Sequence, residues 1–70
     1  MNVVLKWRNK YSNDEGFVKN VLSSKGHFVN TFDINEAKVY KVDKALNKDL
    51  QTLESIGETE NNDFHIINLG

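Results

Sequence analysis

The sequence has no cysteine and no proline, only four glycines, and no long uninterrupted run of apolar residues. The lack of cysteine excludes disulfide bonds and thiolate metal sites, and it suits a reducing compartment. The lack of a long apolar run argues against a signal peptide and a membrane span. So few glycines and prolines argue against a disordered linker. We therefore expect a complete, small, soluble protein that is located in the cytoplasm and has no membrane partner.

Groups that carry catalysis or hold ligands are also scarce. There is no cysteine nucleophile, no glycine-rich phosphate loop, no G-x-S-x-G and no HExxH. The only histidines, His27 and His65, lie far apart in sequence, and the acidic residues at 58–63 lack the spacing of a calcium loop. Seventy residues leave room for one core and little room for a substrate cleft. We expect one non-enzymatic domain spanning 1–70, with no catalytic residue, no metal and no cofactor.

Apolar and polar residues alternate from 2 to 11, which is the pattern of a half-buried strand. Turn-forming residues follow at 12–16, and a second strand is predicted at 17–22. Another turn at 23–26 leads to a third strand at 27–32. Loops this short cannot carry a parallel crossover, so the three strands should form an antiparallel meander.

Apolar residues then recur at helical spacing between Val42 and Ile56. They occupy positions 42, 45, 46, 50, 53 and 56, which fall within about 140° of one another at about 100° per residue. Much of the remaining surface is taken by charged residues, namely Lys44, Lys48, Asp49 and Glu54. Asp43 is a suitable N-cap and Gly57 a suitable C′ residue. The spacing predicts a helix at 43–56.

Residues 33–42 allow two interpretations. Asp33, followed by Glu36 three residues later, resembles a capping box and would start one long helix at Ile34. Alternatively, a turn at 33–37 precedes a short fourth strand at 38–42. We favour the second interpretation, because a helix from Ile34 would turn Ala37 and Tyr40 away from its apolar side.

The predicted fold class is α+β, an antiparallel sheet of four to five short strands with one α-helix packed on one face. The last strand, at 64–69, follows a polar loop at 58–63 and is apolar on both faces, which favours an interior position. The proposed core draws apolar residues from every element: Val3, Leu5, Trp7, Phe28, Phe32, Val42, Leu46, Leu50, Leu53, Ile56, Phe64 and Ile66.

Charge is unevenly distributed although the net charge is only −1. Residues 1–30 carry five Lys or Arg and two acids, whereas 31–70 carry four Lys and eight acids. Lys6, Arg8 and Lys10 would form a row of cations about 6.6 Å apart on one strand face. We interpret this row as the solvent-exposed face of an edge strand, where Lys discourages edge-to-edge pairing with other chains. The alternative is a weak nucleic-acid-binding surface made of Lys6, Arg8, Lys10, Lys19 and Lys25.

The chain as a whole resembles small uncharacterised accessory proteins of phages and prophages in Gram-positive hosts. The resemblance lies in the strand meander, the stretch AKVYK at 37–41, the single leucine-rich helix and the apolar last strand. It implies an accessory protein that acts in the cytoplasm of a bacterial host cell by binding, and it transfers no functional residue. We therefore expect a small protein-interaction module that binds another protein and can form a homodimer.

Overall fold

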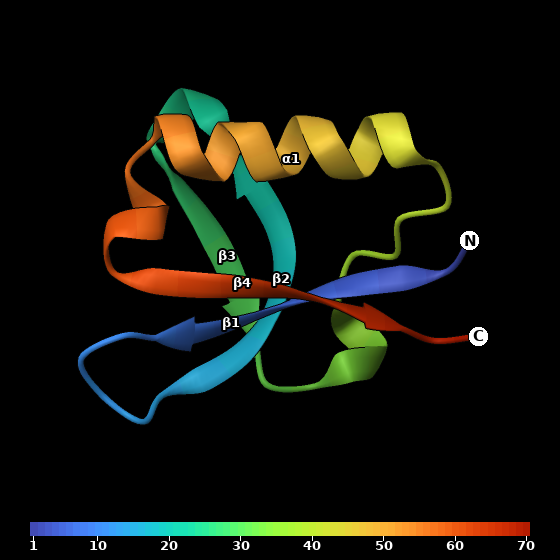
Figure 1. The fold of residues 1–70 in the computed structure, drawn as a ribbon, viewed down its shortest axis with the longest axis horizontal. Coiled ribbons are helices and arrows are strands. Elements are labelled where there is room, and N and C mark those ends of the chain that lie inside the picture. The colour runs from blue at the N-terminus through green and yellow to red at the C-terminus, as the bar shows by residue number, and fades with distance from the viewer.

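Four antiparallel strands form one sheet in the order β3-β2-β1-β4, and α1 packs across one face of it (Figure 1). The computed structural model describes all residues from 1 to 70. The strands are β1 (Val3–Asn9), β2 (Glu15–Leu22), β3 (His27–Thr31) and β4 (Asn62–Asn68), the α-helix is α1 (Asp43–Ser55), and three short 3₁₀ helices are η1 (Ser23–Lys25), η2 (Ile34–Glu36) and η3 (Glu58–Glu60). The predicted α+β class is confirmed, and the ends of these strands and of α1 lie within two residues of the predicted ones.

The order of the strands differs from the prediction at both ends of the chain. β1 lies in the interior of the sheet, because it pairs with β2 on one side and with β4 on the other. β4 pairs with β1 alone and is an edge strand. The predictions that β1 is an edge and that the last strand is interior are therefore wrong. The apolar residues on both faces of β4 do not reflect full burial, since Ile66 remains 53% exposed.

The core lies between the sheet and α1. Its buried members come from β1, β2, α1 and the segment before the helix: Val3, Leu5, Trp7, Val18, Tyr40, Leu46 and Leu53. Phe28, Leu50 and Phe64 are partly buried against this cluster. Trp7, Phe28 and Phe64 form a row of edge-to-face ring contacts, with centroids 6.1 Å and 5.5 Å apart. Such contacts add to the free energy gained by burying the rings.

Three predicted core residues, Phe32, Val42 and Ile66, are instead exposed. Phe32 follows the last residue of β3, and Ile66 lies on the sheet edge. Val42 is the N-cap of α1 with extended backbone angles, so it does not continue the apolar side of the helix. The predicted cap, Asp43, is the first helical residue and makes no capping hydrogen bond.

The connection from β3 to α1 follows the favoured interpretation in outline. The Asp33 Oδ1 atom accepts a hydrogen bond from the Asn35 amide at 2.9 Å and starts η2. The helical backbone ends at Ala37, which has extended backbone angles, so the long helix from Ile34 does not form. The predicted strand at 38–42 is reduced to one bridged residue, Tyr40, which pairs with Val3.

This connection fills a gap between the first two strands. β1 and β2 are paired only along three residues of each strand, from Lys6 to Arg8 and from Glu15 to Phe17. Beyond that point Tyr40 exchanges two backbone hydrogen bonds with Val3 of β1, at 3.1 Å and 2.8 Å. The Lys38 amide donates to the Val18 carbonyl of β2 at 3.0 Å. We call residues 38–40 the wedge, because they take the place that a longer β1–β2 ladder would occupy.

The face of the sheet opposite α1 is partly covered by the same connection. Val4 points away from α1 and is nevertheless fully buried, as is most of Ala37. In Figure 1, α1 lies above the strands and η2 lies below them. No helix of the structure has both the length and the apolar character needed to cross a bilayer.

Candidate functional site

The five cations of the nucleic-acid hypothesis do not form one cluster. Lys6 and Arg8 lie on β1, on the face opposite α1, and Lys10 directly follows that strand. Lys19 lies at the irregularity where the β2–β3 register shifts. Lys25 is in η1, beyond the end of β2 that lies far from the β1–β2 loop. The structure therefore groups three of the five cations and separates the other two from them.

The grouped cations have acidic neighbours within the chain. The Lys6 Nζ atom lies 3.1 Å from Glu15 Oε1, and the Lys10 Nζ atom lies 3.9 Å from Asp63 Oδ1. Arg8 stands between these two acids in the sheet, since its register partners are Glu15 on β2 and Asp63 on β4. Carboxylates at these positions compete with phosphate for the cations and lower the local positive potential.

The aromatic residue between these cations is not available for stacking on bases. Trp7 is 8% exposed and packs against Phe28 on the side of α1. An added Cβ on the facing residue Gly16 would lie 2.9 Å from the Trp7 Nε1 atom, so Gly16 leaves the space that the indole ring needs. The arrangement is that of a core tryptophan.

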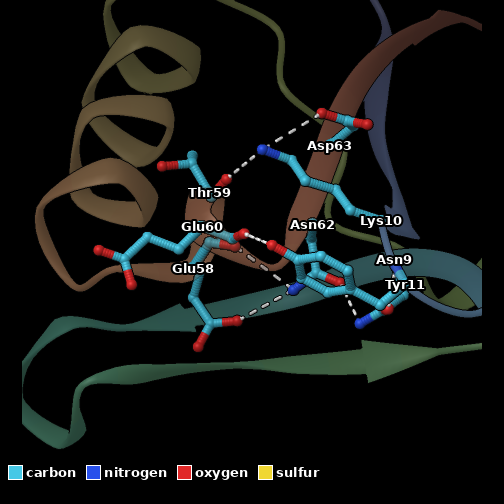
Figure 2. A network of polar contacts seen from close by, with 8 residues as sticks. All are labelled: Asn9, Lys10, Tyr11, Glu58, Thr59, Glu60, Asn62 and Asp63. Carbon is cyan, nitrogen blue, oxygen red and sulfur yellow. Dashed lines mark hydrogen bonds and ion pairs between the residues drawn. The ribbon is translucent and has the colours of Figure 1, made fainter.

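A network of polar contacts joins the β1–β2 loop to η3 and the start of β4 (Figure 2). The Asn9 Nδ2 atom donates to Asn62 Oδ1 at 3.3 Å, and the Asn62 Nδ2 atom donates to Glu58 Oε2 at 3.4 Å. Lys10 donates from Nζ to the Thr59 carbonyl at 2.8 Å. Asn62 is buried, so its amide needs these partners.

Tyr11 extends the same network at the surface. Its hydroxyl donates to the Glu60 carbonyl at 3.4 Å, although the side chain is 80% exposed. Its backbone amide and that of Ser12 both donate to Asn9 Oδ1, at 2.9 Å and 3.0 Å. Because these polar groups bind one another, we interpret the network as a clasp that fixes two loops against each other.

A second polar cluster joins the wedge to α1. The Tyr40 hydroxyl donates to Asp49 Oδ2 at 2.5 Å, and the Lys38 Nζ atom donates to the same oxygen at 2.8 Å. Lys38 also lies 5.1 Å from the centre of the Tyr40 ring. Asp49 is buried on α1, where the sequence prediction assigned it to the charged surface. Its position, three residues after Leu46 and four before Leu53, is the signal that would have revealed its burial.

Burial of the Tyr40 side chain raises the pKa of its phenol far above the usual value. The hydrogen bond to Asp49 and the negative charge of that carboxylate raise it further. Tyr40 therefore stays protonated and acts as a hydrogen-bond donor. Lys38 supplies the positive charge that compensates the buried carboxylate.

The two histidines lie at opposite edges of the sheet, His27 on β3 and His65 on β4, and both are exposed. No group of three or more His, Asp or Glu side chains is placed to hold a metal ion. The structure contains no pocket.

The two chain termini lie at the same end of the molecule (Figure 1), and residues with exposed apolar side chains stand near them in the chain or are hydrogen-bonded to them through the backbone. The Met1 amino group donates to the Lys41 carbonyl at 3.3 Å, which places Met1 next to Val42. The Leu69 amide donates to the Asn2 carbonyl at 2.8 Å, which holds Leu69 beside the start of the chain. Met1, Val42 and Leu69 are 50%, 59% and 46% exposed. We call these three residues the terminal patch.

Comparison with known proteins finds no matching family model, no matching curated protein and no matching solved structure.

Proposed function

We propose that the chain is a small, non-enzymatic protein-interaction module that binds another protein through the terminal patch. The observation that carries the proposal is the patch itself. Backbone hydrogen bonds hold Met1 beside Lys41 and Leu69 beside Asn2, and the three residues of the patch are each about half exposed. Exposed apolar side chains that lie together are typical of surfaces that bind other proteins.

Two further features support a binding role. The polar clusters described above are satisfied internally, so they stabilise the fold, and the exposed apolar side chains, those of the patch among them, are what the surface offers to a partner. The resemblance to phage and prophage accessory proteins supports a partner in a bacterial host or phage. A surface with nearly balanced charge does not select for a strongly acidic or basic partner.

The proposal is tested by affinity capture from a lysate of a Gram-positive host, with the chain as bait. We expect the wild-type chain to retain a specific protein and the double variant Val42→Lys/Leu69→Lys to lose it, because two charges would have to be buried in the contact. Val29→Lys is the matched control. Val29 is 36% exposed on β3, at the other edge of the sheet from β4, so this variant should retain the same protein.

Equal capture by the wild-type chain and the double variant would contradict the assignment of the patch. Circular dichroism of all three proteins shows whether a lost contact reflects a lost fold. The substituted side chains are exposed, so we expect unchanged spectra.

A further inference from the structure

The open edge of β4 offers a second surface, separate from the terminal patch. β4 is seven residues long and pairs with β1 alone. Natural edge strands commonly carry lysine, proline or a bulge that discourages pairing with another chain. β4, with the sequence NDFHIIN, has no lysine and no proline, and its register with β1 is continuous. The other edge strand, β3, is five residues long and pairs with β2 across a register shift.

The backbone groups that face the open edge follow from the pairing with β1. The Leu69 amide donates to the Asn2 carbonyl, and the Lys10 amide donates to the Asn61 carbonyl, both at 2.8 Å. Odd-numbered residues at this end of the chain therefore direct their N–H and C=O groups toward β1. Because these directions alternate along an antiparallel strand, the even-numbered residues face the open edge. They are Asn62, Phe64, Ile66 and Asn68.

These residues are arranged almost symmetrically about His65. Asn62 and Asn68 stand three residues away on either side, and Phe64 and Ile66 stand one residue away. An isologous dimer requires a surface that is complementary to itself about a two-fold axis. We propose that the β4 edge binds a second copy of this chain, antiparallel, with the two-fold axis at His65.

In this register every edge-facing group of β4 finds a partner. Phe64 lies opposite Ile66 of the second copy, and Asn62 lies opposite Asn68, so four residues of each chain form hydrogen-bonded pairs. A two-fold axis at Phe64 or at Ile66 would also match edge-facing residues, but it would pair only three residues of each strand. The axis at His65 is therefore the register with the most hydrogen bonds.

The side chains suit this register on the face toward α1. Ile66 is 53% exposed and Phe64 is half-buried, so each chain places an apolar residue opposite one of the other chain. Aromatic and β-branched residues make favourable cross-strand pairs. A two-fold axis perpendicular to the sheet places both α1 helices on the same face of a continuous eight-stranded sheet. The net charge of −1 per chain provides little repulsion between copies.

The lack of cysteine makes the register directly testable. The two His65 residues would form a non-hydrogen-bonded pair, the position at which opposing Cα atoms come to about 4.5 Å and opposing Cβ atoms approach disulfide distance. We expect His65→Cys to form an intermolecular disulfide rapidly under mild oxidation, visible as a dimer on a non-reducing gel. Asp63→Cys is the matched control, because residue 63 lies on the same face of the same strand. In the proposed register its two copies are about 13 Å apart, and no disulfide should form.

Sedimentation equilibrium of the unmodified chain gives the second measurement. We expect the mass to rise toward twice the 8.0 kDa of one chain at concentrations up to about 200 µM, since a single strand pair is a small interface. A mass that stays at 8.0 kDa, or cross-linking of Asp63→Cys as fast as that of His65→Cys, would overturn the inference. Neither result bears on the terminal patch, which the capture experiment tests separately.

Discussion

At the scale of single residues, Tyr40 has the most consequential position in the molecule. It is 1% exposed, joins β1 through two backbone hydrogen bonds and reaches α1 through its hydroxyl. The residue thus connects the sheet, the wedge and the helix. Its neighbours Lys38 and Asp49 complete a cluster in which a buried carboxylate receives two donors.

The raised pKa of Tyr40 predicts a loss of stability at alkaline pH. An unfolded tyrosine releases its proton near a pKa of about 10, whereas folded Tyr40 holds its proton well above that value. The stabilising contribution is complete below about pH 10 and decreases as pH rises further, because deprotonation then favours the unfolded chain. The slope contributed by one proton is at most about 1.4 kcal/mol per pH unit.

Urea unfolding at pH values from about 8 to about 11 measures this slope. Tyr40→Phe should lower the free energy of unfolding near neutrality by about 1–3 kcal/mol, because the bond to charged Asp49 is lost. It should also flatten the alkaline slope. Tyr11→Phe, which removes an exposed hydroxyl, serves as the control and should keep the slope. A Tyr40→Phe protein with the wild-type slope would show that the phenol is not the responsible group.

At the scale of elements, α1 packs on the sheet through one buried side. Leu46 and Leu53 are 5% and 0% exposed, whereas Leu50 is only partly buried at the margin of the core. The helix has no side-chain N-cap and its cap residue is exposed, so packing rather than capping keeps it in place.

Two alanine substitutions on α1 test its orientation. Leu53→Ala should lower the free energy of unfolding by about 2–5 kcal/mol, which is comparable to the whole stability of a domain of this size, about 3–5 kcal/mol. Leu50→Ala should cost about half as much, because it removes less buried area. Thermal melts followed by circular dichroism give both values. Equal losses at the two positions would mean that α1 faces the sheet with a different side.

The helix and the strands show which features of the fold sequence patterns predict and which they do not. Alternation and helical spacing identified three strands, the helix and the last strand, because these periods follow directly from local geometry. Strand order was not accessible, since periodicity tells which face is apolar and not which strands are neighbours. That is why β1 and β4 exchanged their expected places. A short strand at 38–42 was predicted, but the partners of the wedge were not, because Val3 and Val18 are distant from it in sequence.

The contacts at the candidate sites likewise divide into those that the sequence could predict and those that it could not. The Lys6–Glu15 ion pair joins the first two strands and is within reach of hairpin reasoning from the sequence. The Lys10–Asp63 pair and the clasp around Asn62 require knowledge that β4 lies beside β1. The terminal patch likewise depends on backbone hydrogen bonds between segments that the chain separates widely.

At the scale of the whole molecule, charge is nearly balanced and its cations are interleaved with acids. Nucleic-acid binding rests on many unpaired cations on one surface. We therefore expect no binding of labelled single-stranded or duplex oligonucleotides at low salt up to tens of micromolar protein. Fluorescence anisotropy provides the measurement. Binding that weakens steeply with added salt would favour the alternative function, and Lys19→Glu or Lys25→Glu would then show whether the outlying cations take part.

The position of β1 also has a consequence for the order in which the molecule assembles. This strand is made before the other three, yet its partner along its whole length is β4, the last of the four, with Val3 paired to Asn68 and Asn9 to Asn62. A growing chain in which β4 has not yet been made can pair β1 only with β2, over three residues of each strand. Contacts between residues so distant in sequence slow folding, because much of the chain must be ordered before they form. The centre of the sheet can therefore form only after β4 has been synthesised.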